Sequence, residues 1–254
     1  MNLEQQIQRA AQLIGHAHNI VAMTGAGIST PSGVPDFRSA DSGLWDEVDP
    51  LSVASIHAFR QNPERFYHWI HPLARLLAEA EPNPAHYALA HLEAQSKLKA
   101  VITQNVDNLH RSAGSQTVYE LHGHLREVTC TRCYSVAAAA DLFQQFVETG
   151  AIPRCRCGGI FKPNAILFGE QLPMNEFVSA RLAVEAADLM FIIGSSLEVA
   201  PASDLPEIAL DNGIPVIIIN QQPTFLDPRA ELVIRGNVAE ILPQVVELIA
   251  APQG

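Results

Sequence analysis

Four cysteines form the most concentrated set of metal-binding side chains in the chain. They are arranged as Cys130-x-x-Cys133 and Cys155-x-Cys157, two close pairs of soft ligands. Such pairs are typical of a tetrahedral structural zinc site, in which four thiolates leave no position open for a substrate or a water. Two disulfides, which a reducing compartment disfavours, and unrelated buried cysteines are the alternatives. The spacing predicts one structural Zn²⁺ that stabilises a small module and takes no part in chemistry.

A glycine-rich turn follows the first apolar run of the chain. Residues 20–23 are Ile-Val-Ala-Met, and Gly25-Ala26-Gly27 comes soon after them. Small residues at such a turn let backbone N–H groups approach a pyrophosphate. However, Thr30 replaces the third glycine of the dinucleotide fingerprint, and no acidic residue ends a second strand about 20 positions on. The turn therefore fits a hydride-transfer dehydrogenase poorly, and a purely structural turn stays open.

Polar side chains that could perform acid–base chemistry come later in the chain. Gln104, Asn105 and Asp107 follow the strand-like residues Val-Ile-Thr at 101–103, and His122 lies alone in a Leu-His-Gly segment. No serine or cysteine nucleophile motif lies nearby, so the natural role of His122 is a general base near neutral pH. Strand residues alternate between faces, which puts Asn105 and Asp107 on the same side. An Asx turn at Asp107 and a buried structural histidine are the alternatives.

Short apolar runs alternate with segments of helical periodicity. The runs cover 20–23, 101–103, 189–193, 216–219 and 232–234, and the helical segments cover 3–14, 84–98, 174–187 and 202–212. This alternation predicts an α/β fold with a doubly wound, Rossmann-like parallel sheet. Ligands bind such sheets beyond the carboxyl ends of the strands. Two further polar segments at strand ends suit phosphate or ribose, namely Gly194-Ser195-Ser196 and Asn220-Gln221-Gln222.

Two stretches interrupt this alternation and divide the chain. We expect a discontinuous large Rossmann-like domain formed by 1–30, 81–124 and 166–254. A helical insertion would occupy 31–80, and a small zinc-binding module would occupy 125–165. Within that module, the alanine run 137–140 is expected to be helical.

Seven segments, in order along the chain, resemble one known family. They are the turn at 24–29, Ser32-Gly33-Val34-Pro35-Asp36-Phe37-Arg38, the stretch 103–110, Leu121-His122-Gly123, the four cysteines, Phe168-Gly169-Glu170 and Gly194-Ser195-Ser196. From about residue 15 to residue 240, the chain is similar to the sirtuin family of NAD-dependent protein deacylases. The resemblance implies that NAD is consumed as a co-substrate. Nicotinamide leaves, the oxygen of an acyl-lysine attacks the ribose C1′, and lysine and O-acetyl-ADP-ribose are formed.

The resemblance also implies a role for each site residue. His122 would activate a ribose hydroxyl, Asn105 would orient the ribose or a water, and Asp107 would hydrogen-bond the nicotinamide amide. Gln104 would contact the ribose, and Phe37 would cover the reacting face. The other NAD-binding residues would be Gly25, Ala26, Gly27, Ser29 and Arg38 at the pyrophosphate, Gly194, Ser195 and Ser196 at a phosphate or ribose, Asn220, Gln221 and Gln222 at the adenosine ribose, and Val238 at the adenine. The alternatives are that Arg38 forms a salt bridge and that Val238 is only a core residue.

Acetyl-lysine proteins or peptides are the partners that the resemblance implies. The segment that would pair with the substrate as an added strand contains Ile166, Phe168, Gly169 and Glu170. Sirtuins that remove succinyl or malonyl groups carry Tyr-x-x-Arg in the helical insertion, where the arginine meets the extra carboxylate. Here Tyr67 is followed at that spacing by Ile70, which cannot pair an acidic group. We therefore expect removal of acetyl or another neutral acyl group.

The charge balance argues against polyanionic partners. The 254 residues include 16 Lys plus Arg against 27 Asp plus Glu, for a formal net charge of −11. Such a field repels nucleic-acid backbones and anionic lipid. The stretch 125–162 is only slightly basic, with five Lys or Arg against three Asp or Glu. We therefore expect neither nucleic acid nor a membrane as a partner.

The last expectations concern the cellular location of the protein, its oligomeric state and two alternatives to the deacylase function. The chain has no apolar run approaching the roughly 18–20 residues of a membrane span, and its first residues lack the pattern of an export signal. We expect a cytoplasmic monomer. A mono-ADP-ribosyltransferase that uses the same NAD cleft is one rival function. A non-catalytic, zinc-dependent binding module is the other.

Overall fold

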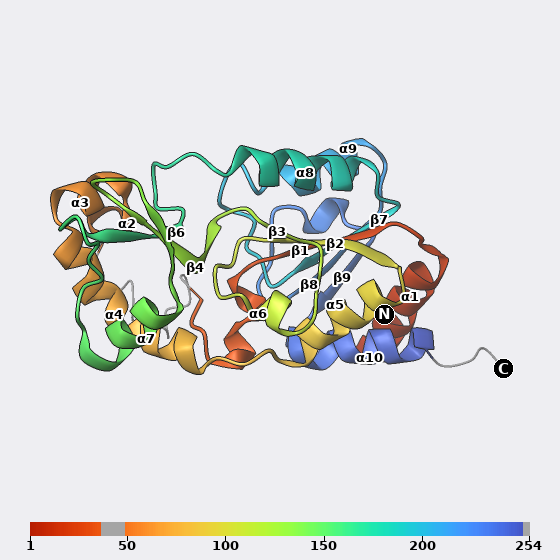
Figure 1. Cartoon of the computed structure of the whole chain (residues 1–254). Coiled ribbons are helices and arrows are strands. Elements are labelled where there is room, and N and C mark those ends of the chain that lie inside the picture. Colours follow the sequence, from red (N-terminus) through yellow and green to blue (C-terminus); the bar gives the residue numbers. More distant parts are fainter. Residues whose placement is uncertain (37–48, 251–254) are drawn as a thin grey trace.

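The structure is a computed structural model that describes residues 1–36 and 49–250 (Figure 1). A large parallel sheet with helices on both faces occupies the right of Figure 1. A smaller antiparallel sheet and a group of helices lie at the left.

The large sheet has six strands that are all parallel to their neighbours. They are β1 (Ile20–Thr24), β2 (Leu98–Thr103), β3 (Val118–Glu120), β7 (Leu189–Ile193), β8 (Val216–Asn220) and β9 (Leu232–Arg235). Their order is β3-β2-β1-β7-β8-β9, so the direction of strand addition reverses between β1 and β7. The doubly wound sheet is confirmed, and such a reversal marks the usual ligand site. The short strand β3 was not predicted.

Helices cover both faces of this sheet. One face packs against α1 (Leu3–His16), α5 (Pro84–Ala94) and α10 (Val238–Ala250), and the other packs against α8 (Met174–Glu185) and α9 (Asp204–Asp211). Alternate residues of β1 supply the two cores, because Ile20 and Ala22 face one and Val21 and Met23 face the other. A strand buried on both faces reads as an unbroken apolar run, which is why the sequence revealed it.

Local signals set the helix ends. The Asn2 side chain accepts the Gln5 N–H at 2.9 Å, and the Gln5 side chain accepts the Asn2 N–H at 3.0 Å. This capping box begins α1. Helix α5 ends at Ala94 rather than at 98, because Ser96 turns the chain at φ +58° and Leu98 opens β2.

The smaller sheet places one long strand between two short ones. Strand β4 (Gly123–Cys130) pairs with β5 (Val136–Ala138) and β6 (Phe161–Ala165), both antiparallel. The expected helix at 137–140 is therefore wrong in its first half, because Ala137 and Ala138 pair with β4. Cross-strand pairing overrides the helix preference of alanine there. Helix α7 (Ala140–Thr149) begins only after the strand.

The helices at 50–79 share a core with the smaller sheet's helix α7. These helices are α2 (Pro50–Ala54), α3 (Ile56–Gln61) and α4 (Pro63–Glu79). Phe59, Phe66 and Tyr67 pack with Phe146 of α7 and with Leu167. The rings of Tyr67 and Phe146 meet edge to face with centroids 5.1 Å apart. Two stretches that are separate in sequence are thus neighbours in space, at one end of the molecule (Figure 1).

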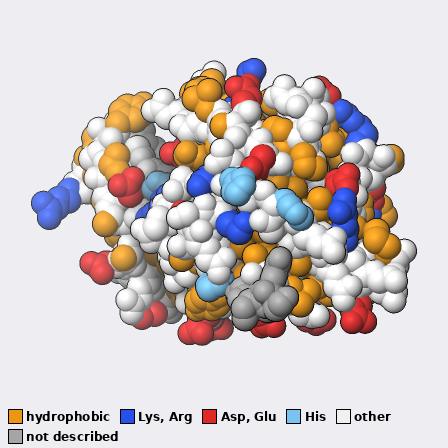
Figure 2. All heavy atoms as spheres, turned by 90° about the vertical axis from the view of Figure 1, so that its right-hand side faces the viewer, with side chains coloured by type: hydrophobic (Ala, Val, Ile, Leu, Met, Phe, Trp, Pro, Cys, Tyr) orange, Lys and Arg blue, Asp and Glu red, His pale blue; other side chains and the backbone are white. Residues whose placement is uncertain are grey.

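Two observations concern the outer surface. Within 1–36 and 49–250, no helix combines the length and apolar character needed to cross a membrane. On the face that Figure 2 shows, Lys and Arg side chains are spread among acidic and neutral ones. That face therefore carries no single concentrated basic patch among its coloured residues.

Candidate active site

Two glycine-containing loops touch where the strand order reverses. The Gly27 N–H donates to the Gly194 carbonyl at 2.8 Å, and the Gly25 N–H donates to the Ile193 carbonyl at 3.2 Å. Gly194 adopts φ +59°, and a Cβ on it would lie 2.3 Å from the Ile28 nitrogen. Only glycine permits this conformation and this close approach together. The loops therefore form one continuous backbone floor at the carboxyl ends of β1 and β7.

A cavity of about 1040 Å³ opens over this floor. Every described residue that was predicted to act in catalysis, NAD binding or peptide binding lines it, and these are Gly25, Ala26, Gly27, Ser29, Gln104, Asn105, Asp107, His122, Ile166, Phe168, Gly169, Glu170, Gly194, Ser195, Ser196, Asn220, Gln221, Gln222 and Val238. Phe37 and Arg38 lie outside the described residues, so their roles stay predictions. Segments from across the chain thus converge on one space.

A buried serine links two of the predicted catalytic side chains. The Ser29 hydroxyl donates to Asp107 Oδ2 at 2.6 Å and accepts from Asn105 Nδ2 at 3.0 Å. Asn105 Nδ2 also donates to the Gly25 carbonyl at 3.0 Å. Asp107 Oδ1 accepts the Leu109 N–H at 2.9 Å, so the Asx turn and the cavity position occur together. Burial raises the pKa of Asp107, and the Ser29 hydrogen bond opposes that rise.

His122 is held in one tautomer. Its Nδ1 lies 3.0 Å from the Gln104 carbonyl oxygen, which can only accept, so Nδ1 carries the hydrogen and Nε2 keeps a lone pair. Burial lowers the pKa of His122, and the hydrogen bond to Gln104 opposes this shift only in part. The ring is therefore neutral at pH 7 and can accept a proton at Nε2. The Ile166 N–H donates to the His122 carbonyl at 2.8 Å, so this base adjoins the predicted peptide segment.

Side-chain amides join the remaining strand ends. Gln104 Nε2 donates to Ser195 Oγ at 3.2 Å. Asn220 Nδ2 donates to the Ser195 carbonyl at 3.1 Å and to the Gln222 carbonyl at 2.9 Å. Val238 is 3% exposed and lies in the core as well as at the cavity wall, so its core position is confirmed and its contact with the adenine stays a prediction.

The segment 166–170 borders the cavity beside α2 and α3. The Phe168 N–H donates to the Ala54 carbonyl, and the Phe168 carbonyl accepts the Ile56 N–H, both at 3.0 Å. Ser55 and Phe168 form an isolated parallel bridge. The segment is thus held in strand-like pairing on one side, which suits the addition of another strand.

Between α4 and α7 the cavity is apolar. Side chains that line it there include Phe66, Tyr67, Ile70 and Leu73 of α4 and Phe143 and Phe146 of α7. The Tyr67 hydroxyl donates to the Phe161 carbonyl at 2.6 Å, and burial raises the pKa of Tyr67. Neither lysine nor arginine occurs among the described residues of the cavity wall. The described part of this wall therefore offers no permanently charged cation that could form an ion pair with an acidic acyl group.

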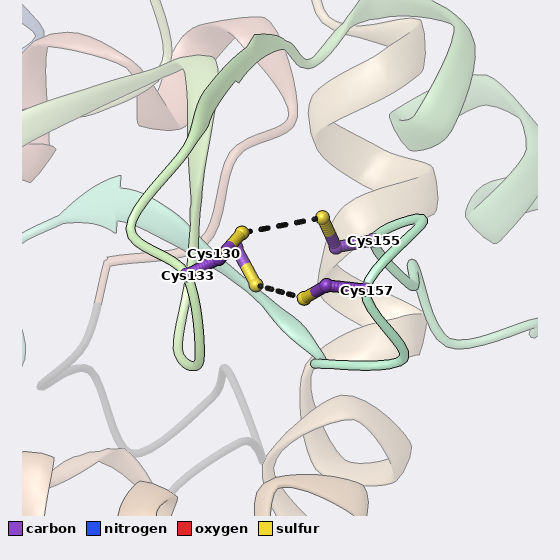
Figure 3. Close-up of side chains that lie close together, drawn as sticks. All are labelled: Cys130, Cys133, Cys155 and Cys157. Atoms are coloured by element: carbon purple, nitrogen blue, oxygen red, sulfur yellow. Dashed lines mark hydrogen bonds between the residues drawn. The ribbon is translucent and has the colours of Figure 1, made fainter.

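The four cysteines converge at the end of β4 (Figure 3). Their Sγ atoms all lie within 4.8 Å of one another, with Cys130 3.5 Å from Cys157 and Cys133 3.7 Å from Cys155. A Cβ on Gly159 would lie 2.7 Å from Cys130 Sγ, so this knuckle needs a glycine. Four thiol donors this close together fit a tetrahedral zinc ion. The narrow Cys155-x-Cys157 gap does not prevent them from converging.

A sequence profile of the Sir2 family matches residues 25–201, a span that includes both glycine loops, His122 and the four cysteines. The chain belongs to the Sir2 family. This Sir2 chain is 44% identical over 247 residues to NAD-dependent protein deacylase 2 of Archaeoglobus fulgidus, covering 96% of each chain. It is also 44% identical over 249 residues to the NAD-dependent protein deacetylase of Sulfolobus acidocaldarius, covering 98% of this chain and 97% of that relative. The predicted sirtuin membership is confirmed.

Solved structures share the Sir2 fold over nearly the whole chain. A structure described as "Structural Basis for the Mechanism and Regulation of Sir2 Enzymes" superposes with a TM-score of 0.91 at 43% identity, covering 97% of this chain and 98% of that one. "The structure of Sir2Af2 bound to a myristoylated histone peptide" superposes with a TM-score of 0.84 at 38% identity, covering 97% of each. Both the large sheet and the smaller sheet therefore belong to the shared fold.

Sequence reasoning missed an ion pair that supports the Sir2 site. Arg126 binds Glu120 in a bidentate manner, with Nη1 2.6 Å from Oε1 and Nη2 2.5 Å from Oε2. Arg126 Nη1 also donates to Asn108 Oδ1 at 2.9 Å. Asn108 adopts φ +66° in the loop that carries Asn105 and Asp107. The pair therefore joins β3, β4 and that loop, and no local sequence pattern marks it.

A second missed residue, Lys162, shapes the predicted peptide segment. Lys162 Nζ lies 2.8 Å from Glu170 Oε2 and donates to the carbonyls of Pro163 at 3.0 Å and Ala165 at 2.9 Å. Glu170 Oε2 also accepts the Leu167 N–H at 2.8 Å. The carboxylate that was predicted to contact substrate is thus already used to hold its own segment.

Proposed function

We propose that this Sir2 protein is an NAD-dependent protein-lysine deacetylase that releases nicotinamide and O-acetyl-ADP-ribose. The observation that carries the proposal is a neutral His122, oriented through Nδ1 by the Gln104 carbonyl, in a cavity wall shared by the cofactor loops and the peptide segment. The two relatives named as NAD-dependent deacylase and deacetylase support the same activity. NAD acts as a co-substrate, because its bond to nicotinamide breaks in the reaction.

Each side chain near the ribose has a separate role in the proposed reaction. His122 Nε2 accepts the proton of a ribose hydroxyl, which makes that oxygen a better nucleophile. Asn105 orients the ribose, and Asp107 binds the nicotinamide amide. Ser29 supports both of them, since its hydroxyl bridges the two side chains. Positioning of this kind lowers the activation barrier without any new covalent bond to the protein.

The backbone binds the rest of NAD. In the loop at 25–27, the Ala26 N–H would take the pyrophosphate at the first strand end, because the Gly25 and Gly27 N–H groups already donate to the carbonyls of Ile193 and Gly194. The amides at 220–222 take the adenosine ribose, and Val238 takes the adenine. Phe37 and Arg38 keep their proposed places over the nicotinamide and at the pyrophosphate.

The protein substrate binds beside His122 through its main chain. An extended acyl-lysine peptide would add a strand to the segment 166–170, which the Ala54 and Ile56 contacts and Lys162 hold in place. Main-chain pairing is largely independent of side chains. The enzyme would therefore accept many protein sequences around the acylated lysine.

The apolar branch of the cavity favours a second candidate activity, removal of long-chain acyl groups. Ile70, Phe143 and Phe146 all line the cavity here, and together they offer more apolar surface than an acetyl group covers. A structure of the same family was solved with a myristoylated histone peptide. An aliphatic chain would gain roughly 0.8 kcal/mol for each CH₂ group buried there.

One peptide carrying acetyl-, myristoyl- or succinyl-lysine tests the acyl preference. We expect turnover of the acetyl and myristoyl peptides and a kcat/KM for the succinyl peptide lower by about 100-fold, since an unpaired carboxylate would be buried. Equal kcat/KM values for the succinyl and acetyl peptides would overturn the preference for neutral groups.

Mass spectrometry of products decides the activity itself. With acetyl-lysine peptide and NAD, we expect equal amounts of nicotinamide, deacetylated peptide and O-acetyl-ADP-ribose. Absence of nicotinamide release would sink the proposal. Labelled ADP-ribose on protein in place of O-acetyl-ADP-ribose would favour an ADP-ribosyltransferase, and failure to bind NAD would favour the non-catalytic zinc module.

One structural zinc is part of the proposed enzyme, and the four thiolates at the end of β4 would hold it.

We further propose that the protein is a cytoplasmic monomer. None of the four cysteines forms a disulfide, which fits a reducing compartment. Light scattering of the purified full chain tests the monomer, and a dimer mass would overturn it.

A further inference from the structure

Buried polar side chains lie beneath the cavity floor, outside the proposed catalytic set. They are Thr24, Asn83, His86, Thr103 and His110, and each is at most 7% exposed. His86 Nε2 and His110 Nδ1 have no hydrogen-bond partner within the described part of the chain. Buried ring nitrogens without partners are rare in proteins and need an explanation.

The neighbours fix the tautomer of each ring. The Asn83 backbone N–H donates to His86 Nδ1 at 3.2 Å, so the hydrogen of neutral His86 is on Nε2. The Thr24 hydroxyl donates to Thr103 Oγ1 at 2.8 Å and therefore accepts from His110 Nε2 at 2.9 Å. His110 Nδ1 then keeps a lone pair. Burial lowers the pKa of His86 to about 4 and that of His110 to about 3, so both rings are neutral at pH 7.

The two unpartnered nitrogens are complementary. His86 Nε2 offers a hydrogen, and His110 Nδ1 offers a lone pair. The rings lie with centroids 4.9 Å apart and planes inclined by 61°. The structure shows no direct hydrogen bond between these two atoms, and one buried water between them would satisfy both nitrogens. All hydrogen bonds from Asn83 to Thr103 then point in one direction.

Both ends of this polar chain hold a loop of the cavity. At one end, Asn83 Nδ2 donates to the Ile28 carbonyl at 2.7 Å and to Ser32 Oγ at 2.9 Å, just after the glycine loop. At the other end, Thr103 Oγ1 accepts the Asn105 backbone N–H at 3.0 Å. Neither Thr103 nor His110 lines the large cavity itself.

We propose that the polar chain from Asn83 to Thr103 is a positioning network that fixes Asn105 relative to the glycine loop, with His110 in its Nε2–H form at the centre. The inference rests on the proposed role of Asn105 toward the ribose. Thr103 and His110 act through Asn105 and touch neither NAD nor peptide. Loss of the network would therefore affect NAD use before peptide use.

A pair of variants at one position tests the network kinetically. Thr103→Val keeps the shape and removes the hydroxyl, and Thr103→Ser keeps the hydroxyl. We expect Thr103→Val to lower kcat/KM for NAD by about tenfold, the effect of one lost hydrogen bond, with a change of less than about twofold in KM for the peptide. Thr103→Ser should rescue the loss. Identical NAD kinetics for the two variants, or equal losses for NAD and peptide, would overturn the inference.

Nuclear magnetic resonance of ¹⁵N-labelled histidine tests the tautomers directly in the NAD-free protein. We expect the Nε2–H form for both His86 and His110, unchanged across neutral pH, with His110→Gln used to assign the His110 signal. An Nδ1–H form of His110 would overturn the proposed direction of the network. This measurement needs no enzymatic turnover, so its outcome is separate from any failure of the proposed function.

Discussion

A single backbone carbonyl decides which nitrogen of His122 can act as a base. The Gln104 oxygen takes the Nδ1 hydrogen at 3.0 Å, and Nε2 is left with the lone pair. Because this acceptor is main chain, the tautomer does not depend on the side chain at position 104. The Gln104 side chain is thereby available for Ser195, which it contacts at 3.2 Å. One residue thus orients the base and links two strand ends.

The lowered pKa of His122 predicts the acid limb of the pH profile. A general base works only when it is neutral, and a pKa below the ordinary 6.5 keeps this ring neutral to lower pH. We expect kcat/KM to fall as the pH drops through that lowered pKa, with a midpoint below 6.5. Rates with acetyl-lysine peptide across the titration range of histidine measure it. A midpoint above 6.5 would contradict the role of burial.

Removal of the His122 ring predicts a larger loss. His122→Ala should lower kcat by about 10²–10⁴-fold, the usual contribution of a general base, while the circular dichroism spectrum stays unchanged. His91→Ala is the matched control, because His91 is exposed on α5 and should leave the rate unaffected. Equal rates for His122→Ala and the wild type would remove the histidine from the mechanism.

At the level of elements, the ends of β1 and β7 matter most. The two strands pair in register from Ile20 with Leu189 to Thr24 with Ile193. The loops that follow the two strands therefore begin side by side at the same edge of the sheet. The loop contact through Gly194 depends on that register. A one-residue slip would move the glycine away from its neighbour and turn every side chain to the opposite face.

Two glycine-to-alanine substitutions distinguish the cost of left-handed backbone strain from the cost of a steric clash made by the added Cβ. Gly213→Ala should cost about 1–2 kcal/mol of unfolding free energy, because Gly213 is left-handed with nothing within 4 Å of an added Cβ. Gly194→Ala should cost more and should also weaken NAD binding, since its Cβ would lie 2.3 Å from the Ile28 nitrogen. Urea unfolding and NAD titration calorimetry measure the two effects. Equal losses in both variants would contradict the proposed close approach.

The ion pair between β3 and β4 predicts a strong stability effect. Arg126→Met leaves the Glu120 carboxylate, only 8% exposed, without its bidentate partner. We expect a loss of about 3–5 kcal/mol in urea unfolding, partly recovered when Glu120→Leu is added. Arg154→Met is the matched control, because it breaks an exposed pair with Glu64 and should cost less than about 1 kcal/mol. Similar losses for both arginines would show that Arg111, whose Nε lies 3.7 Å from Glu120 Oε1, is a sufficient partner for this carboxylate.

Elements with continuous apolar runs could be predicted from the sequence, and elements defined by distant partners could not. Strands β1, β7 and β8 are buried on both faces and read directly as strands. Strand β3 is only Val-Tyr-Glu, and Ala137 is a strand residue only because β4 lies beside it. The polar and glycine residues that line the cavity could be predicted to lie together through their motifs. Lys162 and Arg126 were not, because their importance comes from burial and from partners in the folded chain.

The whole molecule connects the cysteine cluster to the active site through β4. This strand begins directly after His122 and ends at Cys130. Helix α7, which follows β5, supplies Phe146 to the core that includes Tyr67 at the cavity wall. The cluster therefore supports two sides of the substrate region although it lies outside the cavity.

Metal removal should accordingly affect both stability and activity. We expect one zinc per chain by elemental analysis, and a lower melting temperature with loss of deacetylation after chelation, because zinc binding and folding of such modules are coupled. Re-addition of zinc should restore both. Full stability and full activity in the metal-free protein would contradict a structural zinc.

The central position of β1 also bears on how the chain folds during synthesis. Ile20 pairs with Leu98 on one side and with Leu189 on the other. As the chain leaves the ribosome, β1 emerges long before β7, so one edge of a strand that is fully buried in the folded protein has no partner at that stage. Long-range parallel pairing is slow, and exposed strand edges favour aggregation. We therefore expect the nascent N-terminal half to be the part of this protein that is most prone to aggregation, until β7 emerges and pairs with β1 at the centre of the sheet.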